Sequence, residues 1–184
     1  MGNDYEHWFA DFYNRRYDAV YGYALRRANS GTAADIVSET FLIAWRKSTE
    51  LTPDRELPWL FATARRVISN SRRGDERRSA LVSVLSGTTI NVTDPRNSID
   101  TAAHVRVALE AMPEGDREVL LLVAWDGLDM AAAAKTVNCN AATFRVRLHR
   151  ARKRFRAAWE SAQQDLVTEA VEMLSDPELK EIAL

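Results

Sequence analysis

Arginines recur through one segment in the last third of the chain, which reads RVRLHRARKRFR from Arg145 to Arg156. A guanidinium can bond guanine O6 and N7 at once, a contact that discriminates against a wrong base by about 1–3 kcal/mol. The same group pairs with phosphates, which position a protein on DNA without reading its sequence. An isolated arginine-rich helix is more often only a solvated basic surface, so the neighbouring elements must decide between the two interpretations.

The elements around these arginines predict a helix-turn-helix between Asp116 and Phe155. A helix over 114–125 should end at Gly127 in the left-handed conformation. A short alanine-rich helix over 130–137 should follow, and a long helix should begin at Ala141. Three polar residues fit the junctions: Asp129 and Asn140 as N-caps and Asn138 as a left-handed turn residue. This order places the last helix in the DNA major groove.

Helical spacing of 100° per residue assigns faces to the last helix. One stripe should pack on the domain core: Ala141, Phe144, Leu148, Ala151 and Phe155. A second set is placed roughly opposite, to face DNA: Thr143, Arg147, Arg150 and Arg154. A flank nearer the core suits phosphates or intramolecular pairs: Arg145, His149, Arg152 and Arg156. Cys139 lies in the turn, where a small residue filling a tight corner is the simpler interpretation.

The chain preceding this motif predicts further helices. Three span about 5–28, 33–48 and 59–73 or beyond, with Thr32 and Asp35 as a capping box and Pro58 in a first turn. Periodicity is lost from Leu81 to Asp100, and a helix resumes at about 99–112. The predicted fold is all-α, with two small helical domains joined by a flexible linker. The expected divisions are 1–80, a linker over 81–100, a helix-turn-helix domain over 101–159, and an acidic extension over 160–184.

The amino-acid composition excludes several classes of function. The 184 residues carry a formal net charge of −1, so affinity for nucleic acid must come from local patches. One cysteine allows no intramolecular disulfide, and three scattered histidines, without a glycine-rich phosphate loop, suggest neither an enzyme nor a metal or cofactor site. The chain lacks an apolar run long enough to span a membrane, and its acidic, aromatic beginning is unlike a signal peptide. We therefore expect a cytoplasmic protein.

Two motifs in the first eighty residues add a resemblance to a known family. DIVSETFLIAWRK begins at Asp35, and PWLFATARRVISNSRR begins at Pro58. Aromatic residues beside arginines suit melted DNA, whose bases stack while its phosphates pair. With the helix-turn-helix, these motifs resemble the extracytoplasmic-function sigma factors of bacterial RNA polymerase, over about residues 8–159. The matching residues of the second domain include Pro113, Glu114, Arg117 to Leu122, Gly127, Thr143 and Arg147 to Arg152.

The resemblance implies an alternative sigma factor without chemistry of its own, which binds core polymerase at the β′ clamp helices and the β flap. Polymerase binding would fall to Asp35, Ser38, Glu39, Phe41, Trp45 and Arg46. Recognition and melting of the −10 element would fall to Trp59, Arg65, Arg66, Asn70, Arg72 and Arg73. Recognition of the −35 element would fall to Asn140, Thr143, Arg145, Arg147, Arg150 and Arg154. The resemblance also implies promoter DNA and an anti-sigma factor as partners.

Departures from the family pattern and one alternative remain. Ser38, Arg66 and Asn70 stand where the family commonly has Gln, Asn and Asp, so its −10 preference cannot be transferred. The alternative is a helix-turn-helix regulator that never joins polymerase, although an all-helical first domain with the DIVSETFLIAWRK pattern disfavours it.

The acidic segment after Trp159 is predicted to continue as helix to about Ser175 and to break at Asp176-Pro177. Its simplest interpretation is a solvated extension. A sharper hypothesis is that it folds back on the basic face.

Overall fold

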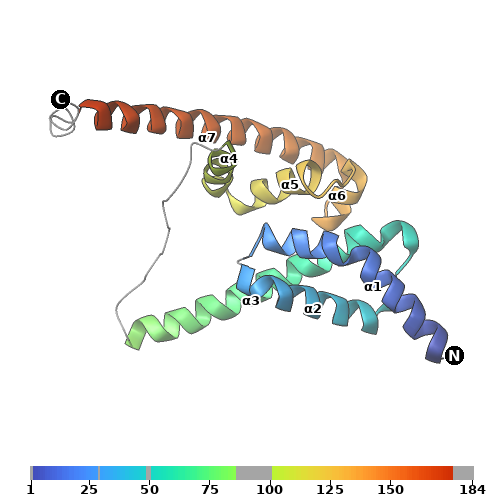
Figure 1. Ribbon diagram of the computed structural model, residues 1–184. Coiled ribbons are helices and arrows are strands. Elements are labelled where there is room, and N and C mark those ends of the chain that lie inside the picture. Colours follow the sequence, from blue (N-terminus) through green and yellow to red (C-terminus); the bar gives the residue numbers. More distant parts are fainter. Residues whose placement is uncertain (1, 29, 49–50, 86–100, 176–184) are drawn as a thin grey trace.

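A computed structural model of the chain describes residues 2–28, 30–48, 51–85 and 101–175, and every regular element within these ranges is helical (Figure 1). The first domain comprises α1 (Gly2–Leu25), α2 (Ser30–Arg46), the 3-10 turn η2 (Pro53–Arg55) and α3 (Glu56–Leu85). The second domain comprises α4 (Thr101–Glu110), α5 (Glu114–Ala124), α6 (Met130–Thr136) and α7 (Ala141–Ser175). Among the described residues, no helix combines the length and the apolar character that crossing a membrane requires.

Aromatic side chains fill the core of the first domain. Phe12 of α1 is fully buried, and its ring stacks on that of Trp8 at a centroid distance of 5.5 Å. Tyr23 stacks on Phe61 of α3 at 4.6 Å. Buried Glu56 accepts a 2.9 Å hydrogen bond from Arg16 Nε, and its place in the first turn of α3 lets the helix dipole stabilise the carboxylate. These contacts join α1 to α3, and the Phe12 ring also meets Phe41 of α2 at a centroid distance of 5.8 Å, so the three helices form one unit.

Aliphatic residues and one phenylalanine form the core of the second domain. Val119 and Leu122 of α5 and Phe144, Leu148 and Ala151 of α7 are buried. Figure 1 shows α4, α5 and α6 lying between α7 and the first domain. The long helix α7 therefore contacts the first domain through its shorter neighbours.

Local signals at the helix-turn-helix junctions are confirmed. Gly127 and Asn138 have φ angles of 67° and 55°, the left-handed values predicted for a helix end and a turn. Asp129 Oδ1 accepts a 2.8 Å hydrogen bond from the Ala132 amide, and Asn140 Oδ1 accepts one of the same length from the Thr143 amide. These caps satisfy amides that the first turns of α6 and α7 would otherwise leave unpaired.

Several boundaries differ from the predictions. Because α2 begins at Ser30, Thr32 lies inside its first turn, and the predicted capping box is wrong. The helix α3 continues to Leu85 and takes in the first five residues of the predicted linker, whereas residues 86–100 lie outside the described part. Ala141 is exposed at the first turn of α7 rather than packed in the core.

The acidic extension continues the last helix to Ser175, as predicted. Residues 160–175 therefore prolong α7 in one direction, and the fold-back hypothesis is wrong for them, because a continuous helix cannot return along its own surface (Figure 1). The predicted break at Asp176-Pro177 lies outside the described residues.

The cap of α6 gives a direct stability prediction. Replacing Asp129 by Ala removes the acceptor for the Ala132 amide, and we expect the free energy of unfolding to fall by about 1 kcal/mol. Asp129→Asn keeps a capping oxygen and should stay within a few tenths of a kcal/mol of the parent protein. Urea denaturation followed by circular dichroism measures both variants, and equal losses in the two would contradict the assignment.

Candidate nucleic-acid interface

The basic residues of α7 divide between solvent and α5. Thr143, Arg145 and Arg150 are exposed, as a DNA-reading surface requires. The Arg154 side chain is also exposed, at 57%, but it forms an ion pair with Asp116 of α5. Arg147 is half-buried, and its Nη2 atom lies 3.7 Å from the position that a Cβ on Gly115 would occupy. Two of the four arginines proposed from the sequence for −35 recognition are therefore turned toward the start of α5.

The prediction that the DNA-facing residues lie on the opposite side of α7 from the core stripe is wrong. At 100° per residue, the positions opposite Phe144 are Val146 and Lys153. Both side chains are exposed, and Val146 reaches 51%. Thr143, Arg147, Arg150 and Arg154 lie beside the core stripe rather than across from it, because their common direction is about a quarter turn away. Asn140 acts first as an N-cap, which fixes the start of α7.

The α3 residues predicted to contact the −10 element also divide. Arg65, Arg66 and Arg73 are exposed, and Arg73 Nη2 donates a 2.6 Å hydrogen bond to Asn70 Oδ1. Trp59 is half-buried against the core, so it anchors α3 as well as reaching solvent. Arg72 bonds Glu114 of α5 and the carbonyl oxygen of Arg27.

A cavity of about 520 Å³ joins this α3 surface to the second domain. Its lining includes Arg65, Arg66 and Arg73 from the first domain, and Gly115 and Arg117 from α5. The two surfaces proposed for DNA thus border one another at α5.

The polymerase-binding surface proposed on α2 is largely solvent-facing. Asp35, Ser38, Glu39 and Arg46 are exposed, with Ser38 Oγ donating a 2.9 Å hydrogen bond to the Ala34 carbonyl. Trp45 is 38% exposed and meets the Phe9 ring edge-on at 4.7 Å. The assignment of Phe41 is corrected, because this ring is only 3% exposed and packs in the core against Phe12 and Tyr13. Leu42, which the motif did not single out as a contact, is 48% exposed.

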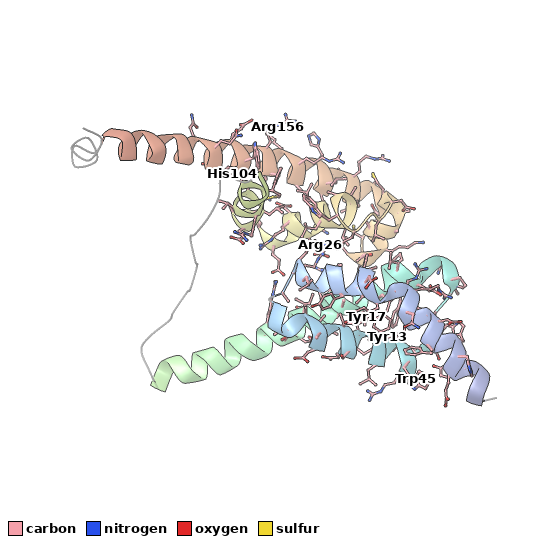
Figure 2. The ribbon with its side chains drawn as sticks, in the orientation of Figure 1. Tyr13, Tyr17, Arg26, Trp45, His104 and Arg156 are labelled. Atoms are coloured by element: carbon pink, nitrogen blue, oxygen red, sulfur yellow. The ribbon has the colours of Figure 1, made fainter. Side chains whose placement is uncertain are left out.

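Sequence reasoning missed a group of polar side chains where α1 meets the second domain, all of them buried except the partly exposed Arg26. This interdomain cluster comprises Tyr23, Arg26, Arg27, Glu118 and Asp126. Arg27 Nε lies 2.5 Å from Glu118 Oε2, and its Nη2 lies 2.6 Å from Asp126 Oδ2. Arg26 Nη2 approaches the other oxygen of Asp126 at 2.5 Å. The Arg26 label in Figure 2 marks the end of α1 that faces the second domain.

Tyr23 completes the hydrogen bonding of the cluster. Its hydroxyl donates to Glu118 Oε1 at 2.8 Å, and the Arg27 guanidinium lies 3.6 Å above its ring, a cation–π contact. Burial, with the nearby Glu118 carboxylate, holds the pKa of Tyr23 well above its ordinary value, so the phenol remains a proton donor. Burial alone would lower the pKa of Arg27, but Tyr23, Glu118 and Asp126 outweigh it, and the pKa is raised.

One sequence signal pointed toward this cluster. Glu118 directly precedes four hydrophobic residues of α5, Val119 to Leu122, and is buried with them, and a carboxylate in such a place requires a cationic or hydrogen-bonding partner. Its partner Arg27 lies 91 positions away in the chain, and no local pattern identifies it.

Two regions of the chain match models of known protein families. A family model described as Sigma-70 region 2 matches residues 12–78, and one described as Sigma-70, region 4 matches residues 104–155. The ECF RNA polymerase sigma factor EcfG of Rhodopseudomonas palustris is 28% identical over 130 residues, which cover 70% of this chain and 72% of that protein. The ECF RNA polymerase sigma factor SigM of Bacillus subtilis is 25% identical over 135 residues, 72% of this chain and 83% of that protein.

Two solved structures share the fold. The sigma factor RpoE from Bartonella quintana, in complex with the anti-sigma factor NepR, has a TM-score of 0.65 at 22% identity and covers 82% of this chain and 97% of its own. CnrH in complex with the cytosolic domain of CnrY has a TM-score of 0.62 at 23% identity, with 85% and 90% covered.

The two family models occur in the same chain, in order, and extend over well more than half of it. The chain therefore belongs to the extracytoplasmic-function group of the sigma-70 family, the alternative sigma factors that direct bacterial RNA polymerase to specific promoters.

Proposed function

We propose that the second domain reads the −35 element with the exposed first turns of α7. The observation that carries this assignment is the capped helix-turn-helix, in which Asp129 and Asn140 fix the helix starts and leave Thr143, Arg145 and Arg150 in solvent. Their short distance from the N-terminus of α7 suits contact with base edges, since recognition helices enter the groove by that end. Arg147 and Arg154 become phosphate contacts once they leave α5.

The first domain binds the −10 element through α3. Arg65, Arg66 and Arg73 supply exposed charge for the backbone of melted DNA, and Trp59 offers a partly exposed ring for stacking. Asn70 and Arg72 extend the same surface toward the second domain. A flipped base costs a few kcal/mol of unstacking, which such contacts offset.

The exposed surface of α2 docks on the clamp helices of the polymerase β′ subunit. Leu42 and the half-exposed Trp45 form its apolar centre, and Asp35, Glu39 and Arg46 surround them with charge. An apolar centre with a charged rim is the usual anatomy of a protein interface. The second domain would contact the β flap of the same enzyme.

Two further expectations follow from the family. The structural relative from Bartonella quintana is bound to an anti-sigma factor, and we assign this chain an anti-sigma partner as well. Its place of action is the cytoplasm, where core polymerase and promoter DNA meet.

Run-off transcription from a genomic promoter library tests the proposal. The purified chain should bind core polymerase and initiate at a subset of promoters that share −10 and −35 sequences. Failure to bind or initiate would contradict it, and DNA binding without polymerase binding would favour a helix-turn-helix regulator.

Substitution of one exposed arginine tests the −35 surface. We expect Arg150→Ala to weaken binding of holoenzyme to a duplex carrying the selected −35 element by about 1–3 kcal/mol, since a bidentate base contact has that worth. Arg156→Ala is the matched control, because this residue is exposed on α7 outside the proposed surface and points away from the first domain (Figure 2). Competition binding at fixed salt measures both, and equal losses would remove Arg150 from base recognition.

Leu42 tests the polymerase surface. Leu42→Asp places a charge at the centre of the proposed apolar contact, and we expect affinity for core polymerase to fall at least about tenfold, which corresponds to roughly 1.4 kcal/mol. Leu42→Met keeps the volume and apolar character and should bind normally. Because the side chain is 48% exposed, helicity should be unchanged in both variants. Wild-type affinity of Leu42→Asp in a pull-down titration would exclude this surface.

A further inference from the structure

The acidic beginning of α5 contacts both surfaces that the proposed function assigns to DNA. Glu114 pairs with Arg72 of the −10 surface, and Asp116 pairs with Arg154 of the −35 surface. These two carboxylates are two residues apart, which is about 3 Å along a helix axis. One turn of α5 therefore occupies an arginine of each surface at the same time.

This proximity is incompatible with reading a promoter. Elements named −10 and −35 lie about 25 base pairs apart, roughly 85 Å of duplex at 3.4 Å per pair. Arginines that meet neighbouring residues of one helix cannot contact both elements without a large separation of the domains. The arrangement described here is thus a closed form.

The buried ion pairs, and not the exposed ones, must hold this form together. The Arg72 and Glu114 side chains are 42% and 70% exposed, and exposed pairs contribute little. Arg27 and Glu118 are only 6% and 8% exposed, and the side chain of Asp126 is fully covered. Removing one partner of such a group leaves a charge without compensation, unless the domains part and water replaces it.

We propose that the interdomain cluster is an autoinhibitory lock: Tyr23, Arg26 and Arg27 of the first domain bind Glu118 and Asp126 of the second. The cluster thereby holds Glu114 against Arg72 and keeps the −10 surface beside the −35 surface, whose Arg154 is paired with Asp116 inside the second domain. In the free chain Glu114 takes the place of a DNA phosphate at Arg72. Engagement with promoter and polymerase requires the lock to open. This inference rests on the proposed function for the meaning of closure, but the closure itself concerns the free chain.

The decisive variant removes both carboxylate charges and keeps their shape. Glu118→Gln combined with Asp126→Asn leaves Arg27 without an anionic partner in the cluster, so the domains should separate and hydrate it. The matched control is Asp11→Asn with Glu160→Gln, which changes net charge equally at two exposed positions that line neither of the pockets between the domains. Tyr23→Phe is a milder variant, because it deletes only the hydroxyl that bonds Glu118 and retains the stacked ring.

Small-angle X-ray scattering of each free, full-length variant measures closure without polymerase. We expect the lock variant to increase the radius of gyration and the maximum dimension by several ångströms, Tyr23→Phe to give a smaller increase, and the control to match the parent chain. Affinity for a duplex of arbitrary sequence at low salt should rise roughly tenfold in the lock variant, because a larger fraction of chains is competent to bind.

A lock variant with native helicity whose scattering and DNA affinity equal those of the control overturns the proposal. If circular dichroism shows that the double variant has lost helicity, Tyr23→Phe decides, and parent-like scattering from it overturns the proposal equally. These measurements separate the two ideas, because a chain that opens as expected but never supports run-off transcription would defeat the proposed function and leave the lock intact.

Discussion

The buried guanidinium of Arg27 determines how the two domains are placed relative to one another. Arg27 is held between Glu118 and Asp126 and above the ring of Tyr23. A buried charge is tolerable only when its hydrogen-bonding capacity is met. Arg27, two residues past the end of α1, must therefore stay in register with Glu118 in α5 and with Asp126, two residues past the end of α5. That register brings Glu114 to Arg72, and α6 meets the start of α3, where Thr136 Oγ1 lies 3.4 Å from the Pro58 carbonyl oxygen. The −10 surface lies against the second domain because of this one group.

The sequence was informative for the local structure of the helix-turn-helix junctions, although a local pattern also misplaced the start of α2 at Thr32. Gly127, Asp129, Asn138 and Asn140 could be placed correctly because capping and left-handed turns depend on a few neighbouring residues. Prediction failed where a second element intervenes. The faces of α7 were assigned from helical spacing within that helix alone, which contains no information about α5. The pairing of Arg154 with Asp116 could not be predicted in this way. Phe41 lay within a recognised motif, but burial between helices, rather than motif membership, decides that its ring serves the core.

The distribution of charge reconciles a near-neutral protein with the binding of a polyanion. The formal net charge of −1 conceals arginines gathered on α3 and α7 and carboxylates gathered at the start of α5. Exposed arginines such as Arg65 and Arg150 stay available for DNA, whereas Arg27 is committed to structure. Residue type alone does not separate these roles, because the same guanidinium serves both, and the separating quantity is solvent exposure.

The length and continuity of α7 have a mechanical consequence. Thirty-five residues form one helix of about 52 Å, and neither glycine nor proline interrupts it between Ala141 and Ser175. Its first turns belong to the helix-turn-helix, and its last turns extend beyond α4 (Figure 1). Such a rod transmits torque, since a rotation imposed at the far end reaches the first turns without a hinge to absorb it. A protein bound to the last turns of α7 would therefore change the orientation of the −35 surface without contacting any residue of that surface.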